Sequence, residues 1–217
     1  MYTSHYYAWT KRLLVAVVFF TVNEAHANAL HFQFRPLSGS CITTARAVSQ
    51  EAPPKPEKIL PDFGDAGTTR FSVGIAGADN FDDFAMVLAR VSIELFVIDG
   101  VSVGIEGDVG YIGQSVGDDG VGAGVSIRAR WHFLRRECWS MYADIAAGLF
   151  QSSVDVPAGS GQFKFYPQAG GGVSLSIAHD QRLLVGARWC HLSNARTLSE
   201  NVGIDGLQIY AMLSFGF

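Results

Sequence analysis

The chain has 217 residues, of which 48% are hydrophobic and only 17% are charged, and its formal net charge is −4 at pH 7. This acidic balance lacks the basic footprint of a nucleic-acid-binding protein, so no nucleic-acid partner is expected. No apolar run reaches the ~18 residues that a membrane-spanning helix needs.

The N-terminus has the pattern of an export signal. Lys11 and Arg12 precede an apolar run over 13–22, and an Ala-x-Ala sequence ends at Ala27. A basic region, a short apolar core and small residues at a cleavage site are typical of a secretory signal peptide. Residues 1–27 are therefore predicted to be a signal peptide.

Residues 28–67 have little hydrophobic periodicity and include a proline-rich stretch over 52–58. Such composition favours an extended, solvated chain. The segment is predicted to be a flexible periplasmic tail, and the sequence assigns no function to it.

From residue 68 to residue 217 apolar residues alternate with small or polar ones. This period of two is typical of strands with one apolar face. It predicts eight strands, at 71–75, 85–97, 101–111, 121–133, 141–149, 163–177, 183–193 and 205–217. Pro167 cannot donate to a strand ladder, so an irregularity is expected there.

The connections between these strands alternate in length. Those near 98–100, 135–137 and 178–181 are short, whereas the others are mostly longer and richer in Gly, Asp and Ser. Short periplasmic turns with longer outer loops are typical of outer-membrane barrels. In this arrangement Cys138 and Cys190 lie at opposite ends, so they are predicted not to pair.

The two faces of the predicted strands differ in polarity. One face carries charges of both signs, which could pair in a narrow interior: Glu94, Glu106, Asp108, Arg128, Arg130, Asp144, Lys164 and Arg188. The apolar face carries bulky aromatic residues, which would crowd the interior of a soluble, lipocalin-like barrel of eight strands. Facing lipid, they form two girdles, with Tyr111, Phe163, Phe165 and Trp189 at the outer ends and Trp131, Phe133, Trp139 and Phe215 at the periplasmic ends. The predicted fold is all-β, an eight-stranded antiparallel transmembrane β-barrel in a bacterial outer membrane.

Three polar residues lie on this lipid face beside the last long loop. His191 and Ser193 are two apart on one strand, about 6–7 Å between Cα atoms, and Asp205 starts the next strand on the same face. Single polar residues are tolerated at membrane interfaces without a function. The three together indicate a catalytic triad, with Ser193 as nucleophile, His191 as general base and Asp205 fixing the imidazole tautomer.

A developing oxyanion would also need hydrogen-bond donors. Loop backbone amides and the side chains of Asn194 and Asn201 are candidates, and Gly203 lies in the same segment; the sequence does not choose among them. His132 and His179 are isolated, so neither a metal nor another cofactor is predicted.

The motif His191-x-Ser193-Asn194, followed by Asn201-x-Gly203-x-Asp205 and an aromatic-ended strand, resembles the C-terminal signature of the lipid A 3-O-deacylase (PagL) family. The resemblance is sharp over about residues 188–217, and the earlier strands match only in pattern. It implies an eight-stranded outer-membrane barrel with a His-Ser-Glu triad on its lipid-facing surface. It also implies a serine esterase that hydrolyses the 3-O-linked primary acyl chain of lipid A, and hence lipopolysaccharide modification.

One position departs from that signature, because Asp205 is one methylene shorter than the family's glutamate. The strand register must then bring the carboxylate closer to His191, or Glu200 in the loop takes its place. The rival interpretation is a non-catalytic small barrel with a structural or adhesive role. A channel is disfavoured since side chains fill an eight-stranded lumen. The sequence leaves open whether the barrel forms a homodimer.

Overall fold

The computed structural model describes residues 63–195 and 203–217, so the predicted signal peptide and most of the predicted tail lie outside the described residues. The strands are β1 (Thr69–Asp79), β2 (Phe84–Ile98), β3 (Val101–Gln114), β4 (Gly120–Arg135), β5 (Trp139–Ser152), β6 (Phe163–Phe165), β7 (Gln168–Ala178), β8 (Gln181–Leu192) and β9 (Ile204–Gly216). Among these residues no helix is long and apolar enough to cross a membrane.

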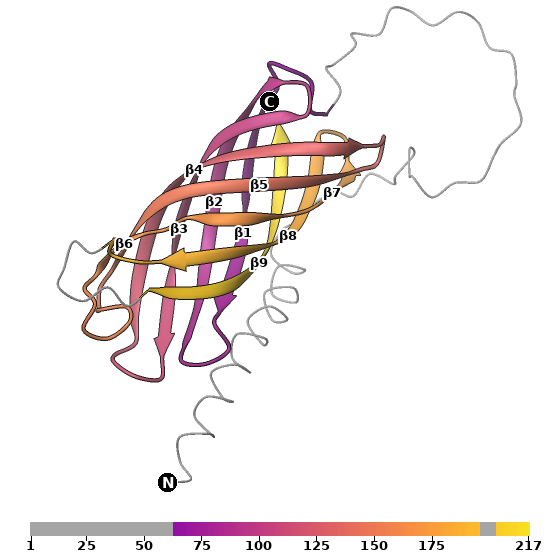
Figure 1. Ribbon diagram of the computed structural model, residues 1–217. Coiled ribbons are helices and arrows are strands. Elements are labelled where there is room, and N and C mark those ends of the chain that lie inside the picture. Colours follow the sequence, from indigo (N-terminus) through magenta and orange to yellow (C-terminus); the bar gives the residue numbers. More distant parts are fainter. Residues whose placement is uncertain (1–62, 196–202) are drawn as a thin grey trace, which may run out of the picture.

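The strands form a closed antiparallel ring (Figure 1). β9 pairs with β1, β4 pairs with β5, and β6 and β7 both pair with β5 as two parts of one strand. The ring therefore has eight strand positions, as predicted, and closure pairs the backbone groups that an open sheet edge would leave exposed.

The break between β6 and β7 falls at the predicted proline. Tyr166 still exchanges backbone hydrogen bonds with Gly148, with N···O distances of 2.7 and 3.1 Å. Pro167 follows and has no N–H to donate, so the regular ladder is interrupted there. The predicted irregularity is confirmed.

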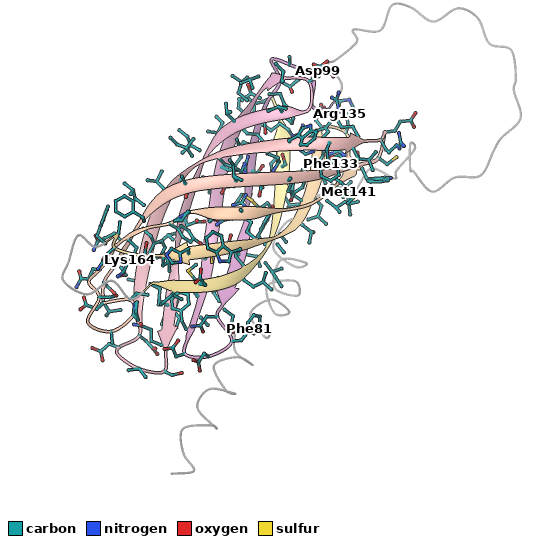
Figure 2. The ribbon with its side chains drawn as sticks, in the orientation of Figure 1. Phe81, Asp99, Phe133, Arg135, Met141 and Lys164 are labelled. Carbon is teal, nitrogen blue, oxygen red and sulfur yellow. The ribbon has the colours of Figure 1, made fainter. Side chains whose placement is uncertain are left out.

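The two ends of the barrel differ as the connection lengths predicted. β2–β3, β4–β5 and β7–β8 are joined by short turns, and the longer 153–162 connection, the end of β8 and the start of β9 lie at the other end. Figure 2 shows Phe81 and Lys164 toward the long-loop end and Asp99 and Arg135 toward the short-turn end. Cys190, near the long-loop end of β8, is a buried free thiol, so the prediction that it does not pair with Cys138 is confirmed.

The barrel interior holds the predicted charged residues, all of them buried. Arg188 donates to Glu106 at 2.6 Å and to Asp144 at 2.8 Å. Arg128 donates to Glu94 at 2.6 Å and also to Glu106. These pairs compensate one another's charge, and they fill the interior with side chains in place of a water-filled lumen.

The outer wall is apolar along its height. Exposed aliphatic side chains of neighbouring strands cover it, and the predicted girdle aromatics Tyr111, Phe163, Phe165, Trp189, Trp131, Phe133 and Trp139 are exposed on it. Phe133 lies toward the short-turn end in Figure 2. The assignment of the apolar face to the outside is confirmed.

Phe63 packs into the short-turn end of the barrel. Its ring lies 5.5 Å from that of Phe96 and 5.0 Å from that of His132, and the Arg182 guanidinium lies 3.8 Å from its centroid. The segment before β1 therefore contributes to closing this end, which the sequence did not predict.

Candidate active site

His191 and Asp205 stand directly opposite each other on β8 and β9, and Nδ1 of His191 lies 2.9 Å from Oδ1 of Asp205. The backbone N–H of His191 donates to the Pro167 carbonyl at 3.0 Å, so it points toward β7. On the β9 side the two residues therefore form a non-hydrogen-bonded pair, the arrangement with the shorter Cα separation of about 4.5 Å. This register compensates for the methylene that Asp205 lacks.

Ser193 lies just beyond the end of β8, half-buried and on the same face as His191. Its backbone forms an isolated bridge with Phe165, with N···O distances of 2.7 and 3.2 Å. Within the described residues its hydroxyl makes no hydrogen bond, so β6 holds the backbone while Oγ is not hydrogen-bonded to His191. Catalytic hydrogen bonds often tighten only when substrate binds.

Gly203 lies against the imidazole of His191. A Cβ at this position would be 2.6 Å from Cε1 and 3.0 Å from Nε2 of the ring. Nε2 is the nitrogen that a general base would use, because Nδ1 faces Asp205. The glycine thus lets the chain approach the reactive edge of the ring.

We expect Gly203→Ala to lower by ~10²-fold the rate of the ester hydrolysis that the sequence predicts, because the added methyl must displace the imidazole. Gly107→Ala on the same outer wall is the matched control, since its Cβ would meet only Val91 Cγ2 at an ordinary 3.5 Å. The measurement is the initial rate of fatty-acid release in detergent micelles. Equal rates for the two variants would contradict a role for the close approach.

Asn194 points away from this face. Its side chain is buried, and Nδ2 donates to the Ser160 carbonyl at 3.1 Å, where Lys164 Nζ also donates at 2.7 Å. The carboxamide therefore anchors the 153–162 loop to the end of β8 and does not lie beside His191 as an oxyanion donor would. Asn201 and Glu200 lie outside the described residues.

Trp189 is part of the site although the sequence placed it only in the aromatic girdle. Its indole Nε1 donates to Oδ1 of Asp205 at 2.9 Å, and its ring stacks on His191. The only sequence signal was its position two residues before His191 on the same face. Trp189 and Asp205 are both odd-numbered and lie on one face, but this does not predict their contact, because the contact is diagonal across the ladder.

Of two similar solved structures, the first supports this architecture. Among solved structures, Neisserial surface protein A (NspA) is 14% identical, with a TM-score of 0.54 over 69% of this chain and 97% of that one. The outer-membrane protein OprG of Pseudomonas aeruginosa is 9% identical, with a TM-score of 0.49 over 70% and 97% of the two chains. No curated protein sequence matches.

The family comparison reaches further. The family model described as "Lipid A 3-O-deacylase (PagL)" matches residues 96–214, which include every described residue of the candidate site. The protein is a β-barrel of the bacterial outer membrane. The chain belongs to the lipid A 3-O-deacylase (PagL) family.

Proposed function

We propose that this barrel is a serine esterase that hydrolyses the 3-O-linked primary acyl chain of lipid A in the outer leaflet. The observation that carries the proposal is the His191–Asp205 hydrogen bond of 2.9 Å on the lipid-facing wall, two residues from Ser193. Membership of the lipid A 3-O-deacylase family supports the choice of substrate.

The reaction follows from the order of these side chains. Asp205 accepts a hydrogen bond from Nδ1–H of His191, which leaves Nε2 unprotonated as the base. Nε2 takes the proton of Ser193 Oγ as the oxygen attacks the ester carbonyl carbon. The resulting imidazolium then protonates the departing sugar oxygen, and an acyl-serine ester remains. Water, deprotonated by His191, hydrolyses that ester and releases a 3-hydroxy fatty acid.

The position of the site suits a substrate that never leaves the membrane. Ser193 lies just beyond β8 and Asp205 near the start of β9, both at the long-loop end of the barrel. At the strand ends of an outer-membrane barrel the wall meets the lipid headgroups. Phe165, paired with Ser193, and Trp189 expose aromatic surface around them. The ester can reach Ser193 laterally while the acyl chain stays in lipid, so no path through the filled interior is needed.

The test is mass spectrometry of lipid A from cells that express the protein and from cells with an empty vector. We expect the loss of one 3-hydroxyacyl mass, with the matching free 3-hydroxy fatty acid in the lipid extract. The assay is repeated on detergent-disrupted membranes, where substrate access is unrestricted. Unchanged lipid A in both preparations would contradict the proposal and favour a non-catalytic barrel.

Substitutions at Asp205 test the acid and the register together. We expect Asp205→Ala to lower the turnover rate by about 10³–10⁴-fold, because the imidazole loses its orienting partner. Asp205→Glu should retain more activity than alanine but less than wild type, since the present register already places the shorter carboxylate at 2.9 Å. Both rates are measured as fatty-acid release in micelles. If Asp205→Ala turned over at the wild-type rate, Asp205 would not be the acid of the triad.

A further inference from the structure

We infer that Trp189 is a positioning residue of this site, whose indole N–H holds the Asp205 carboxylate against His191. The inference rests on the proposed function for its catalytic consequence, whereas the contact itself is structural. The family signature described above begins at His191 and does not include this tryptophan, which precedes His191 by two residues.

The geometry joins three side chains from two strands. Oδ1 of Asp205 accepts from Nε1 of Trp189 and pairs with Nδ1 of His191, each at 2.9 Å. Trp189 stands opposite Leu207 and therefore reaches Asp205 diagonally. Its ring also lies nearly parallel to the imidazole, with centroids 5.8 Å apart and an interplanar angle of 19°.

Asp205 needs a second restraint because its side chain is 65% exposed on the barrel wall. A surface carboxylate with a single partner can rotate away, and the rate of a triad depends on how closely its members are held. The indole N–H binds the same carboxylate oxygen as the imidazole and so supplies that second restraint. The stacked ring also presents its negative π-face to the imidazolium that forms during acyl transfer, within the ~6 Å at which cation–π attraction acts.

Trp189 differs in this respect from other tryptophans of the girdles. Trp131 and Trp139 are exposed at the short-turn end, and within the described residues neither indole donates a hydrogen bond. Among the aromatic rings of residues 63–195 and 203–217, Trp131 contacts only that of Phe133, at a centroid distance of 5.8 Å and an interplanar angle of 64°. An interfacial anchor needs no carboxylate partner, so the Trp189–Asp205 bond points to a role beyond membrane anchoring.

The kinetic test is a double-mutant cycle. Trp189→Phe keeps an aromatic ring in the girdle but removes the N–H donor. We expect it to lower kcat about 10-fold with little change in KM, because a hydrogen bond to a charged group is lost. In an Asp205→Ala background the same change should alter kcat by less than about 2-fold, since its target is gone. Trp131→Phe, the matched control, should change kcat by less than about 2-fold in each background, relative to that background without the Trp131 change.

A loss of equal size in the presence and absence of Asp205 would overturn the inference and reduce Trp189 to a membrane anchor. Unchanged kcat in Trp189→Phe alongside an active wild type would overturn it as well. In each case the proposed esterase function would survive.

An activity-free measurement separates the two proposals. In ¹⁵N-histidine-labelled protein the Nδ1–H signal of His191, assigned by its loss in His191→Gln, should exchange with water several-fold faster in Trp189→Phe than in wild type. Equal exchange rates would contradict the positioning role. If the wild type were inactive but the exchange rates still differed, the esterase proposal would be wrong and the positioning contact would be supported.

Discussion

Replacing Ser193 with alanine is expected to abolish deacylation of lipid A, with a fall in turnover of about 10⁴–10⁶-fold, because the proposed nucleophile is removed. The barrel should fold as before, since the Ser193 hydroxyl makes no hydrogen bond within the described residues and its backbone bridge to Phe165 does not depend on the side chain. The measurement is mass spectrometry of lipid A from cells that express each form, together with the rate of 3-hydroxy fatty-acid release from purified protein in micelles.

Ser176→Ala is the matched control, because Ser176 is an exposed serine at the short-turn end of β7. It should deacylate lipid A like the wild type. Heat-induced shifts in gel mobility report whether each variant forms a folded barrel. A folded Ser193→Ala protein with wild-type turnover would show that Ser193 is not the nucleophile.

The second large effect is expected inside the barrel, where Glu106→Ala should lower the free energy of unfolding by about 3–5 kcal/mol. Glu106 is fully buried and pairs with Arg188 at 2.6 and 3.1 Å, with Arg128, and with Arg90 at 3.9 Å. Its removal leaves buried guanidinium groups short of a carboxylate, and that uncompensated charge is what destabilises the fold.

Urea unfolding in lipid vesicles, followed by tryptophan fluorescence, measures this change. Glu137→Ala is the matched control, because Glu137 is exposed in the β4–β5 turn and its loss should change stability by less than about 0.5 kcal/mol. Equal stability of the two variants would show that water or neighbouring side chains compensate the charge of the guanidinium groups that lose Glu106.

The fold was predictable because the two faces of each strand meet opposite environments. Alternation of period two places odd-numbered residues such as Val91 and Ile93 on the wall and even-numbered ones such as Arg90 on the interior, and one slip would reverse them all. The pairing of Glu106 with Arg188, 82 residues apart, was not predictable. It depends on how the barrel is sheared, which periodicity does not report.

For the candidate site, too, the sequence predicted which face each residue occupies but not the register between the strands. Parity placed His191 and Asp205 on one face, but a two-residue shift of register would have kept that parity and separated them. The diagonal bond of Trp189 depends on the same register. Parity did carry a signal about Asn194, whose even number assigns it to the interior, where the structure has it. Phe63 lies in a segment without periodicity, so no pattern could have placed it.

The pairing of β8 with β9 makes the proposed chemistry depend on assembly of the barrel. Asp205 lies on the last strand, and the same strand completes the ring by pairing with β1. A newly made chain in which this strand is still unpaired has its imidazole and its carboxylate on separate, mobile segments. The pairing that completes the proposed triad is therefore part of the same event that closes the ring, so the proposed esterase would become active only in the assembled barrel.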